Sequence, residues 1–304
     1  MTSMIRQAKR TPVQKFITDP AVGLFAVTLF LIFKIMPVKM ASNVGGALGS
    51  FLGRFATKRG QIGMRNLEIA FPEKSVAERR EILDKMWEHW GRFFGEMPHL
   101  KILYKRSRIE GLDLIKKEKA HPRGGFFCSA HIGNWEVAVS SPLIDDFYLN
   151  PVYRPANNPW LDKLMFQRRK GVLIPKGQAG ARKMVDVLRN KGYVVILCDQ
   201  KFREGIDVPF FGKMAKSPSA IATISLKMDL PIFMGHCVRQ KDGNFAFHIE
   251  KPLDVKKIQA NAKDRAEAEY KIMLHVNKRI EGWIRETPEQ WLWIHRRFDK
   301  SEYK

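Results

Sequence analysis

Cysteine is scarce in this sequence, which carries only Cys128, Cys198 and Cys237 among 304 residues. Three cysteines are too few, and odd in number, for a disulfide framework, so the sequence favours a reducing compartment. His, Cys and acidic residues also lack the spacing of a zinc site. We therefore expect neither a metal ion nor another cofactor.

Glycine and proline are not enriched, with 22 and 16 residues, which excludes a collagen-like or low-complexity chain. Acidic side chains are outnumbered, because 53 Lys and Arg stand against 31 Asp and Glu, for a net charge of +22. This balance predicts an anionic partner, such as nucleic acid, an acidic membrane surface, a phosphorylated ligand or an acidic protein. The hydrophobic fraction of 45% excludes global disorder.

One long apolar segment lies near the N-terminus. Residues 21–33 carry no charge, and up to Val38 only Lys34 interrupts the segment. Its length is near the lower limit for crossing a bilayer, and no small-x-small cleavage site follows it. We predict a membrane anchor over residues 1–40 and one larger domain over 41–304, with a cleaved signal peptide and a buried helix as alternatives. Residues 40–60 could form an interfacial amphipathic helix.

The rest of the chain alternates between strand-like and helix-like patterns. Apolar residues at helical spacing predict a helix over 75–103, with Ser75 and Glu78 as a capping box. Strands are expected at 124–130, 148–153, 193–198, 231–238, 245–250 and 290–294. Helices are expected at 159–170, 179–191, 217–228 and 262–285, the third with Ser217 as N-cap. This order predicts an α/β fold with a central, largely parallel or mixed sheet flanked by helices.

The motif with the clearest chemistry begins at His131 and reads H-I-G-N-W-E. His131 follows an expected strand, and Glu136 should lie in the first turn of the next helix, with Asn134 as its N-cap. Ligands of open α/β sheets bind at this edge. A carboxylate that holds one imidazole nitrogen leaves the other free as a general base, so we expect Glu136 to orient His131.

Two features limit the reaction that such a pair could perform. No G-x-S-x-G motif is present, so nothing indicates an acyl-enzyme serine, and direct transfer to an acceptor alcohol is favoured. By itself, however, H-x-x-x-x-E is a weak pattern, and a buried histidine capped by its own loop would carry it too. No nucleic-acid-binding motif accompanies the basic charge.

A longer series of motifs changes this balance. After H-I-G-N-W-E come Tyr153-Arg154-Pro155 with Asn158-Pro159, then Asp199 with Val208-Pro209-Phe210-Phe211, and finally a block over 291–298. In order and content these blocks resemble the late acyltransferases of lipid A biosynthesis, the lauroyl and myristoyl enzymes of the lysophospholipid acyltransferase superfamily. One departure is Gln200, which follows Asp199 where that family often has a second Asp or Asn.

The resemblance implies an acyltransferase that moves a fatty acyl chain from acyl carrier protein to a hydroxyl of a Kdo-bearing lipid A precursor. It implies a bacterial inner-membrane protein whose catalytic domain lies on the cytoplasmic face. The expected catalytic residues are His131 and Glu136, and the expected substrate-binding residues are Arg154, Asn158, Arg169 and Asp199. Residues 151–216 hold 14 Lys and Arg but five Asp and Glu, which suits an acidic carrier protein and a phosphorylated glycolipid acceptor.

Other activities remain open from the sequence. A glycerolipid acyltransferase would share the motifs, and a lipase or thioesterase would use water as the acceptor. A non-enzymatic protein that binds an anionic membrane or nucleic acid would share only the basic charge, and we expect no nucleic acid as a partner.

Overall fold

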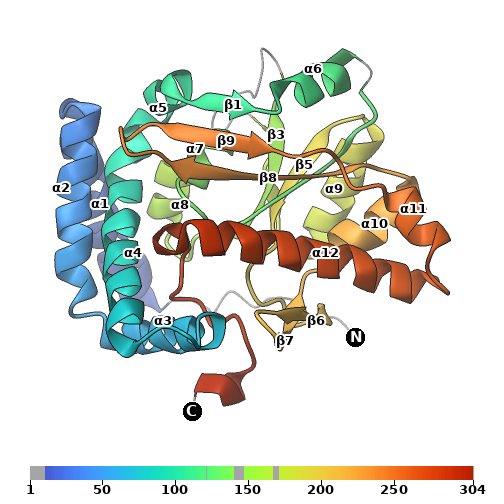
Figure 1. The fold of residues 1–304 in the computed structure, drawn as a ribbon. Coiled ribbons are helices and arrows are strands. Elements are labelled where there is room, and N and C mark those ends of the chain that lie inside the picture. The colour runs from blue at the N-terminus through green and yellow to red at the C-terminus, as the bar shows by residue number, and fades with distance from the viewer. Residues whose placement is uncertain (1–10, 121, 140–146, 167–170, 304) are drawn as a thin grey trace.

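The computed structural model describes residues 11–120, 122–139, 147–166 and 171–303. Its centre is a seven-stranded sheet with the strand order β1-β9-β8-β2-β5-β3-β4, surrounded by helices (Figure 1). Strands β8 and β9 pair antiparallel, and the other neighbours pair parallel. The predicted α/β class with a mostly parallel sheet is therefore confirmed.

The sheet strands are β1 (Arg108–Glu110), β2 (Gly125–Ser129), β3 (Leu149–Tyr153), β4 (Ile174–Pro175), β5 (Tyr193–Leu197), β8 (Ile232–Arg239) and β9 (Phe245–Ile249). A separate antiparallel hairpin consists of β6 (Ile206–Phe210) and β7 (Lys213–Ser217). The α-helices are α1 (Asp19–Ile35), α2 (Val38–Gly53), α3 (Thr57–Ala70), α4 (Val76–Glu96), α5 (Leu100–Arg106), α6 (Leu112–Ala120), α7 (Trp135–Val139), α8 (Pro159–Phe166), α9 (Gln178–Arg189), α10 (Ala220–Met228), α11 (Val255–Ala260) and α12 (Arg265–Glu286).

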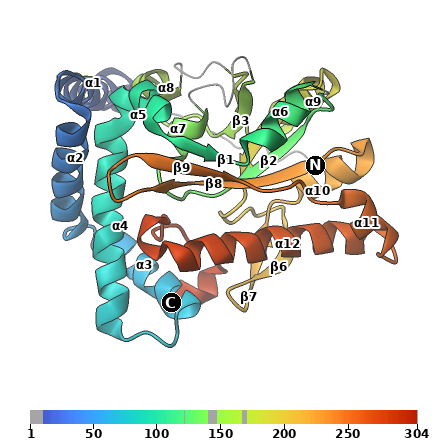
Figure 2. The ribbon, with the colours of Figure 1, turned by 45° about the horizontal axis from the view of Figure 1, so that its top comes forward.

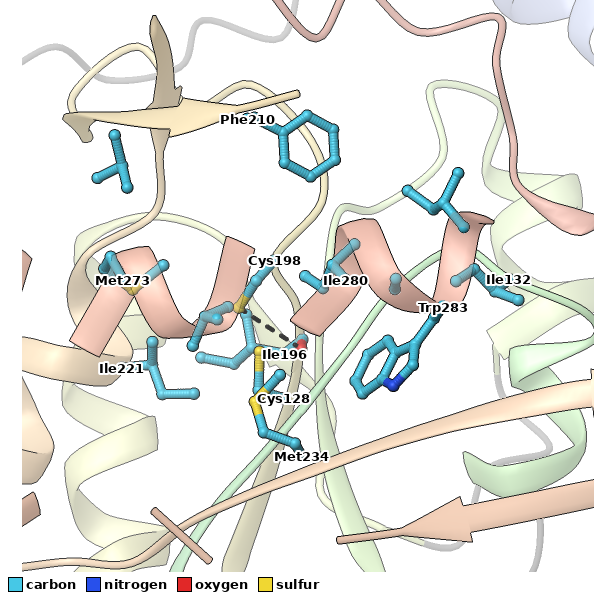
Figure 3. Packing of buried hydrophobic residues seen from close by; sticks show 14 of the residues in the cluster. Cys128, Ile132, Ile196, Cys198, Phe210, Ile221, Met234, Met273, Ile280 and Trp283 are labelled. Atoms are coloured by element: carbon cyan, nitrogen blue, oxygen red, sulfur yellow. Dashed lines mark hydrogen bonds between the residues drawn. The ribbon is translucent and has the colours of Figure 1, made fainter. Parts of the chain in front are cut away.

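The central strands are buried on both faces, as expected for parallel strands between layers of helices. Successive side chains of a strand point to opposite faces, so Cys128 of β2 packs toward α12 while Phe127 packs on the other side. Figure 3 shows Cys128, Cys198 and Met234 meeting Ile280 and other side chains of α12 in the larger core. This rigid sheet fixes the positions at which its strands end.

Most of the predicted elements are present, with some differences in their bounds. The capping box forms at the start of α4, where the Ser75 hydroxyl accepts from the Glu78 main chain and the Glu78 carboxylate accepts from the Ser75 main chain. Two predictions are wrong. Ser217 does not cap α10 but ends β7, where its hydroxyl binds the Arg297 guanidinium, and α10 begins at Ala220. Residues 290–294 form no strand, and Trp291 makes one isolated bridge with Ile132.

The N-terminal helices pack against one end of the domain. In Figures 1 and 2, α2 lies alongside α4 at this end. Their contact is close because it consists of glycines: a Cβ on Gly91 of α4 would overlap the carbonyl oxygen of Gly45 and lie 2.7 Å from the Cα of Gly49 on α2. The predicted amphipathic segment is thus helical over α2.

Helix α1 and the turns before it form one apolar helix over Gln14–Ile35, long enough to cross a membrane. One face of it packs on the domain. A Cβ on Gly23 would lie 2.5 Å from the Cβ of Trp160, and the ring of His99 donates through Nε2 to the carbonyl of Phe33 at 2.8 Å. The other face is exposed, with Leu24, Phe25 and Ile35 at 68%, 70% and 84%.

Candidate active site

The carboxyl ends of neighbouring parallel strands bring together residues that are far apart in the sequence. His131 follows β2 and Asp199 follows β5, and these strands pair in register from Gly125 with Tyr193 to Ser129 with Leu197. The Cys198 main chain extends the pairing by donating to the Ser129 carbonyl at 2.9 Å. As a consequence, His131 and Asp199 emerge side by side at the edge where α/β sheets bind ligands.

Asp199 holds both the main chain and the side chain of His131. Its Oδ1 lies 2.8 Å from His131 Nδ1, and its Oδ2 accepts from the His131 main-chain N–H at 2.9 Å. The indole Nε1 of Trp291 also donates to Oδ2, at 2.7 Å. Burial would raise the pKa of this carboxyl, but the charge of His131 and these hydrogen bonds outweigh burial and lower the pKa to about 2.

This arrangement determines which ring nitrogen of His131 can accept a proton. An ionised carboxylate only accepts hydrogen bonds, so Nδ1 carries the hydrogen and Nε2 presents a lone pair. Gln200 Nε2 lies 3.2 Å from Nε2 and 3.4 Å from Nδ1 of this ring, so its amide is close to both nitrogens. The His131 side chain is 17% exposed, which leaves it accessible to a substrate.

Aromatic side chains surround the imidazole. The edge of Trp135 packs against the His131 ring with the centroids 4.8 Å apart, and the His295 ring lies 6.2 Å away. Burial and the neighbouring His131 lower the pKa of His295 to about 4, so His295 is neutral at neutral pH. Trp135 in turn stacks on Trp90 of α4, which supports the loop from behind.

The loop after His131 bends as its sequence predicts. Gly133 has a φ of +59°, and a Cβ there would overlap the carbonyl of Cys237, so a larger residue would be strained. Asn134, the expected N-cap, instead directs its amide to Glu96 of α4, with Nδ2 donating to Oε2 at 2.9 Å. Its buried Oδ1 accepts no hydrogen bond from the described residues. Asn134 therefore ties the loop to α4.

Glu136 lies in the first turn of α7 as predicted, and its side chain is buried. Within the described residues, the hydrogen bonds of the His131 ring go to Asp199 and Gln200, and none joins it to Glu136. The carboxylate that orients the ring in this structure is therefore Asp199, which we expected to bind substrate.

The remaining expected residues lie at or near the same edge. Arg154 follows β3 directly, and Lys176 follows β4, the neighbour of β3; Lys176 interacts electrostatically with both Arg154 and Asp199. Asn158 begins α8, where its Oδ1 accepts from the Trp160 main chain and its Nδ2 donates to the Asp19 carbonyl. Arg169 lies outside the described residues.

Sequence reasoning missed Gln200, His295 and the role of Trp291 at this site. Each belongs to one of the sequence blocks named above, but only the fold brings them to His131. The apolar Val208 and Phe210 lie in the main core, on the hairpin that follows Asp199. No group of three or more His, Cys, Asp or Glu side chains among the described residues could hold a metal ion.

The chain is similar to known proteins over most of its length. The model of the bacterial lipid A biosynthesis acyltransferase family matches residues 14–300. The lipid A biosynthesis lauroyltransferase of Escherichia coli (strain K12) is 27% identical over 281 residues, covering 86% of each chain. The lipid A biosynthesis palmitoleoyltransferase of the same organism is 24% identical over 292 residues, covering 90% of each chain. A lipid A biosynthesis acyltransferase of Haemophilus influenzae is 24% identical over 282 residues, 88% of this chain and 84% of its own.

Proposed function

The chain belongs to the bacterial lipid A biosynthesis acyltransferase family, and from this premise we propose that it moves a fatty acyl chain from acyl carrier protein to a hydroxyl of a Kdo-bearing lipid A precursor. The donor and the sugar acceptor go beyond what membership of the family states. The excess of basic side chains suits both, because acyl carrier protein is acidic and the acceptor carries phosphates and sugar carboxylates.

The observation that carries the mechanism is the contact between Asp199 and His131 Nδ1. With Nδ1 protonated, Nε2 takes the proton of the acceptor hydroxyl as its oxygen attacks the thioester carbonyl. A carbon–oxygen bond forms, the carbon–sulfur bond breaks, and the imidazolium returns the proton to the departing carrier thiol. The negative charge of Asp199 stabilises the transient imidazolium, as in a Ser-His-Asp triad that lacks its serine.

Basic side chains beside this pair suit the charges of the substrates. Arg154 and Lys176 follow β3 and β4, at the edge where His131 emerges, and a guanidinium can bind phosphate in a bidentate manner. We assign Arg154 to a phosphate of the acceptor or to the charge that develops on the thioester oxygen. Arg169 belongs to the same basic block and is assigned to the acceptor on sequence alone.

Glu136 and Asn158 complete the proposed site in different ways. The buried carboxylate of Glu136, next to the catalytic loop, is assigned a role in turnover that does not depend on contact with the imidazole. Asn158 uses both ends of its amide within the protein, so its effect on substrate would come through the position of α8 and α1.

The N-terminal helices support a position at the membrane. The exposed apolar face of α1 would give the protein access to its lipid acceptor, and we propose the cytoplasmic face of the bacterial inner membrane, where acyl carrier protein is available.

The test is a transfer assay with purified full-length protein, acyl-loaded carrier protein and a Kdo-bearing lipid A precursor. We expect donor consumption that depends on this acceptor, and a loss of about 10²–10⁴-fold in His131→Ala with an unchanged unfolding temperature. Consumption that proceeds equally without acceptor would indicate a thioesterase, and preference for a glycerolipid acceptor would indicate a glycerolipid acyltransferase. Near-normal transfer by folded His131→Ala would contradict the mechanism.

A further inference from the structure

A cavity lies away from His131, where the N-terminal helices meet the domain. Its volume is about 380 Å³, and it lies between the start of α2, α4, α5 and the turn that joins β8 to β9. None of His131, Asp199 or Gln200 lines it. Five basic and two acidic side chains do, so the cavity has three positive charges in excess: Lys39, Arg92, Arg106, Arg239 and Lys241 against Glu96 and Asp242.

The floor of this cavity is a rigid ionic network. The buried carboxylate of Glu96 accepts hydrogen bonds from both terminal guanidinium nitrogens of Arg239, and the Ser42 hydroxyl donates to the same carboxylate at 2.7 Å. Arg92 donates to the carboxylate of Glu88 at 2.7 Å and to the side-chain Oδ1 of Asn43 at 2.6 Å. These two arginines are therefore fixed in place and largely neutralised.

The other three cations have no such partner. Lys39 of α2, Arg106 at the end of α5 and Lys241 of the β8–β9 turn are exposed, and no ion pair or hydrogen bond joins their side chains to the described residues. They come from three separate elements and converge on one cavity. The tight turn holds Lys241, since Gln240 accepts from Gly243 at 3.0 Å and donates to Asn244 at 2.8 Å. The first turn of α2 adds the positive end of a helix dipole.

The location of the cavity indicates which kind of anion could reach its basic side chains. Lys39 directly precedes Met40, the first of a row of exposed apolar side chains along α2 that continues through Val44, Leu48, Phe51 and Leu52 and ends at Phe55, in the turn after α2. Helix α1 ends just before the cavity, with Ile35 84% exposed. An apolar helix face with cations at its end is typical of a segment that lies at a lipid surface. With these helix faces at a lipid surface, the cavity would lie at the level of the headgroups.

We propose that this cavity binds the phosphate of an anionic lipid headgroup, through Lys39, Arg106 and Lys241. The site is separate from acyl transfer and holds the protein on its membrane. Each lysine or arginine near an anionic lipid surface strengthens the attraction of the protein to that surface. The planar guanidinium of arginine can also bind a phosphate through two hydrogen bonds.

The experiment uses full-length protein in a non-ionic detergent and follows its unfolding temperature while phospholipid is added. Phosphatidylglycerol should raise the unfolding temperature, because a ligand that binds the folded state stabilises it. Zwitterionic phosphatidylcholine should have a much smaller effect. The variant Lys39→Gln/Arg106→Gln/Lys241→Gln should lose about tenfold or more in apparent affinity for phosphatidylglycerol.

The matched control removes three exposed lysines from the far side of the domain, Lys227→Gln/Lys257→Gln/Lys263→Gln, and should respond like the wild type. Arg106→Lys keeps the charge and should keep most of the response. If both triple variants lost the same affinity for phosphatidylglycerol, the effect would come from net charge, and the proposed site at this cavity would be wrong. If inorganic phosphate raised the unfolding temperature as much at equal phosphorus concentration, the ligand would be free phosphate, and the proposal of a lipid headgroup would be wrong. If the cavity variant instead lost only its affinity for acyl carrier protein, the occupant would be that protein.

Discussion

In the proposed mechanism, Asp199 decides which nitrogen of His131 accepts the proton of the acceptor hydroxyl. Asp199→Asn replaces an acceptor by an amide that can donate to Nδ1, which would move the ring hydrogen to Nε2 and remove the base. We expect transfer to fall by about 10²–10⁴-fold. Glu136→Gln, measured beside it, should leave the ring hydrogen in place. Initial rates with both variants check this, and full activity in Asp199→Asn would contradict the assignment.

The same carboxylate predicts a pH dependence of stability. Its pKa is about 2 in the folded protein, below the value of about 3.9 for an unfolded aspartate. A lowered folded pKa stabilises the protein above the unfolded value, and this contribution is lost as the pH falls from about 4 to about 2. The stability difference between wild type and Asp199→Asn, measured by urea unfolding, should therefore shrink as the pH falls from about 4 to about 2. A difference that stays the same over that range would contradict the lowered pKa of Asp199.

Arg154 can act in two ways that separate kinetically. Loss of phosphate binding raises KM for the acceptor, whereas loss of transition-state stabilisation lowers kcat. Arg154→Lys keeps the charge without the fork, so it should rescue a point-charge role better than a bidentate one. Rates against acceptor concentration for Arg154→Ala and Arg154→Lys distinguish the two, with the exposed Arg182→Ala of α9 as control. If the curves of Arg154→Ala and Arg154→Lys superimpose on that of the wild type, Arg154 has no role in the reaction.

How much of the site the sequence predicts depends on distance along the chain. His131 and Glu136 are recognisable because they share one short motif at a strand end. Asp199 is recognisable as part of a block, but its contact with His131 is not, because it requires β2 and β5 to be neighbours in the sheet. Strand order comes from the packing of the whole sheet, which no local pattern contains.

The elements follow the same rule. Helix α4 is predictable because its capping box and apolar spacing are local, and buried strands such as β5 are predictable from their composition. The β6–β7 hairpin is not, because Ser217 followed by Pro218 has the local signature of a helix start. There, strand pairing with Ile206 and the hydrogen bond from buried Arg297 outweigh the capping preference of serine.

The contribution of the α2–α4 contact to the stability of the protein can be tested by substituting single glycines. A methyl group at Gly91 would overlap the backbone of Gly45, so Gly91→Ala should destabilise the protein by about 1–3 kcal/mol. Gly60 of α3 is the control, because a Cβ there meets no atom within 4 Å. Gly60→Ala should be neutral or stabilising by up to about 1 kcal/mol. Equal unfolding temperatures for both variants would contradict the close packing.

The molecule as a whole places its apolar helices on one side of a basic domain. Helix α1 contacts α8 near its start and the His99 turn near its end, so it is part of the domain as well as a candidate anchor. Removing residues 1–40 would therefore also remove Phe30 and Phe33, whose side chains are buried against the domain, and would confuse loss of the anchor with loss of packing. Substitutions on the exposed face avoid this problem.

Two triple variants test separately how much α1 and α2 contribute to membrane binding. Leu24→Ser/Phe25→Ser/Leu31→Ser alters the exposed face of α1, and Leu48→Ser/Leu52→Ser/Phe55→Ser alters the row along α2. Each apolar side chain that leaves water contributes about 1.5–3 kcal/mol, so either triple should lower the fraction of protein that sediments with membranes in high salt. The combination should release most of it. Val76→Ser/Val172→Ser/Met214→Ser, exposed apolar residues elsewhere, should sediment like the wild type. If the combined variant stayed with the membranes while remaining folded, neither helix face would be the anchor, and attachment would lie with the basic surface of the domain.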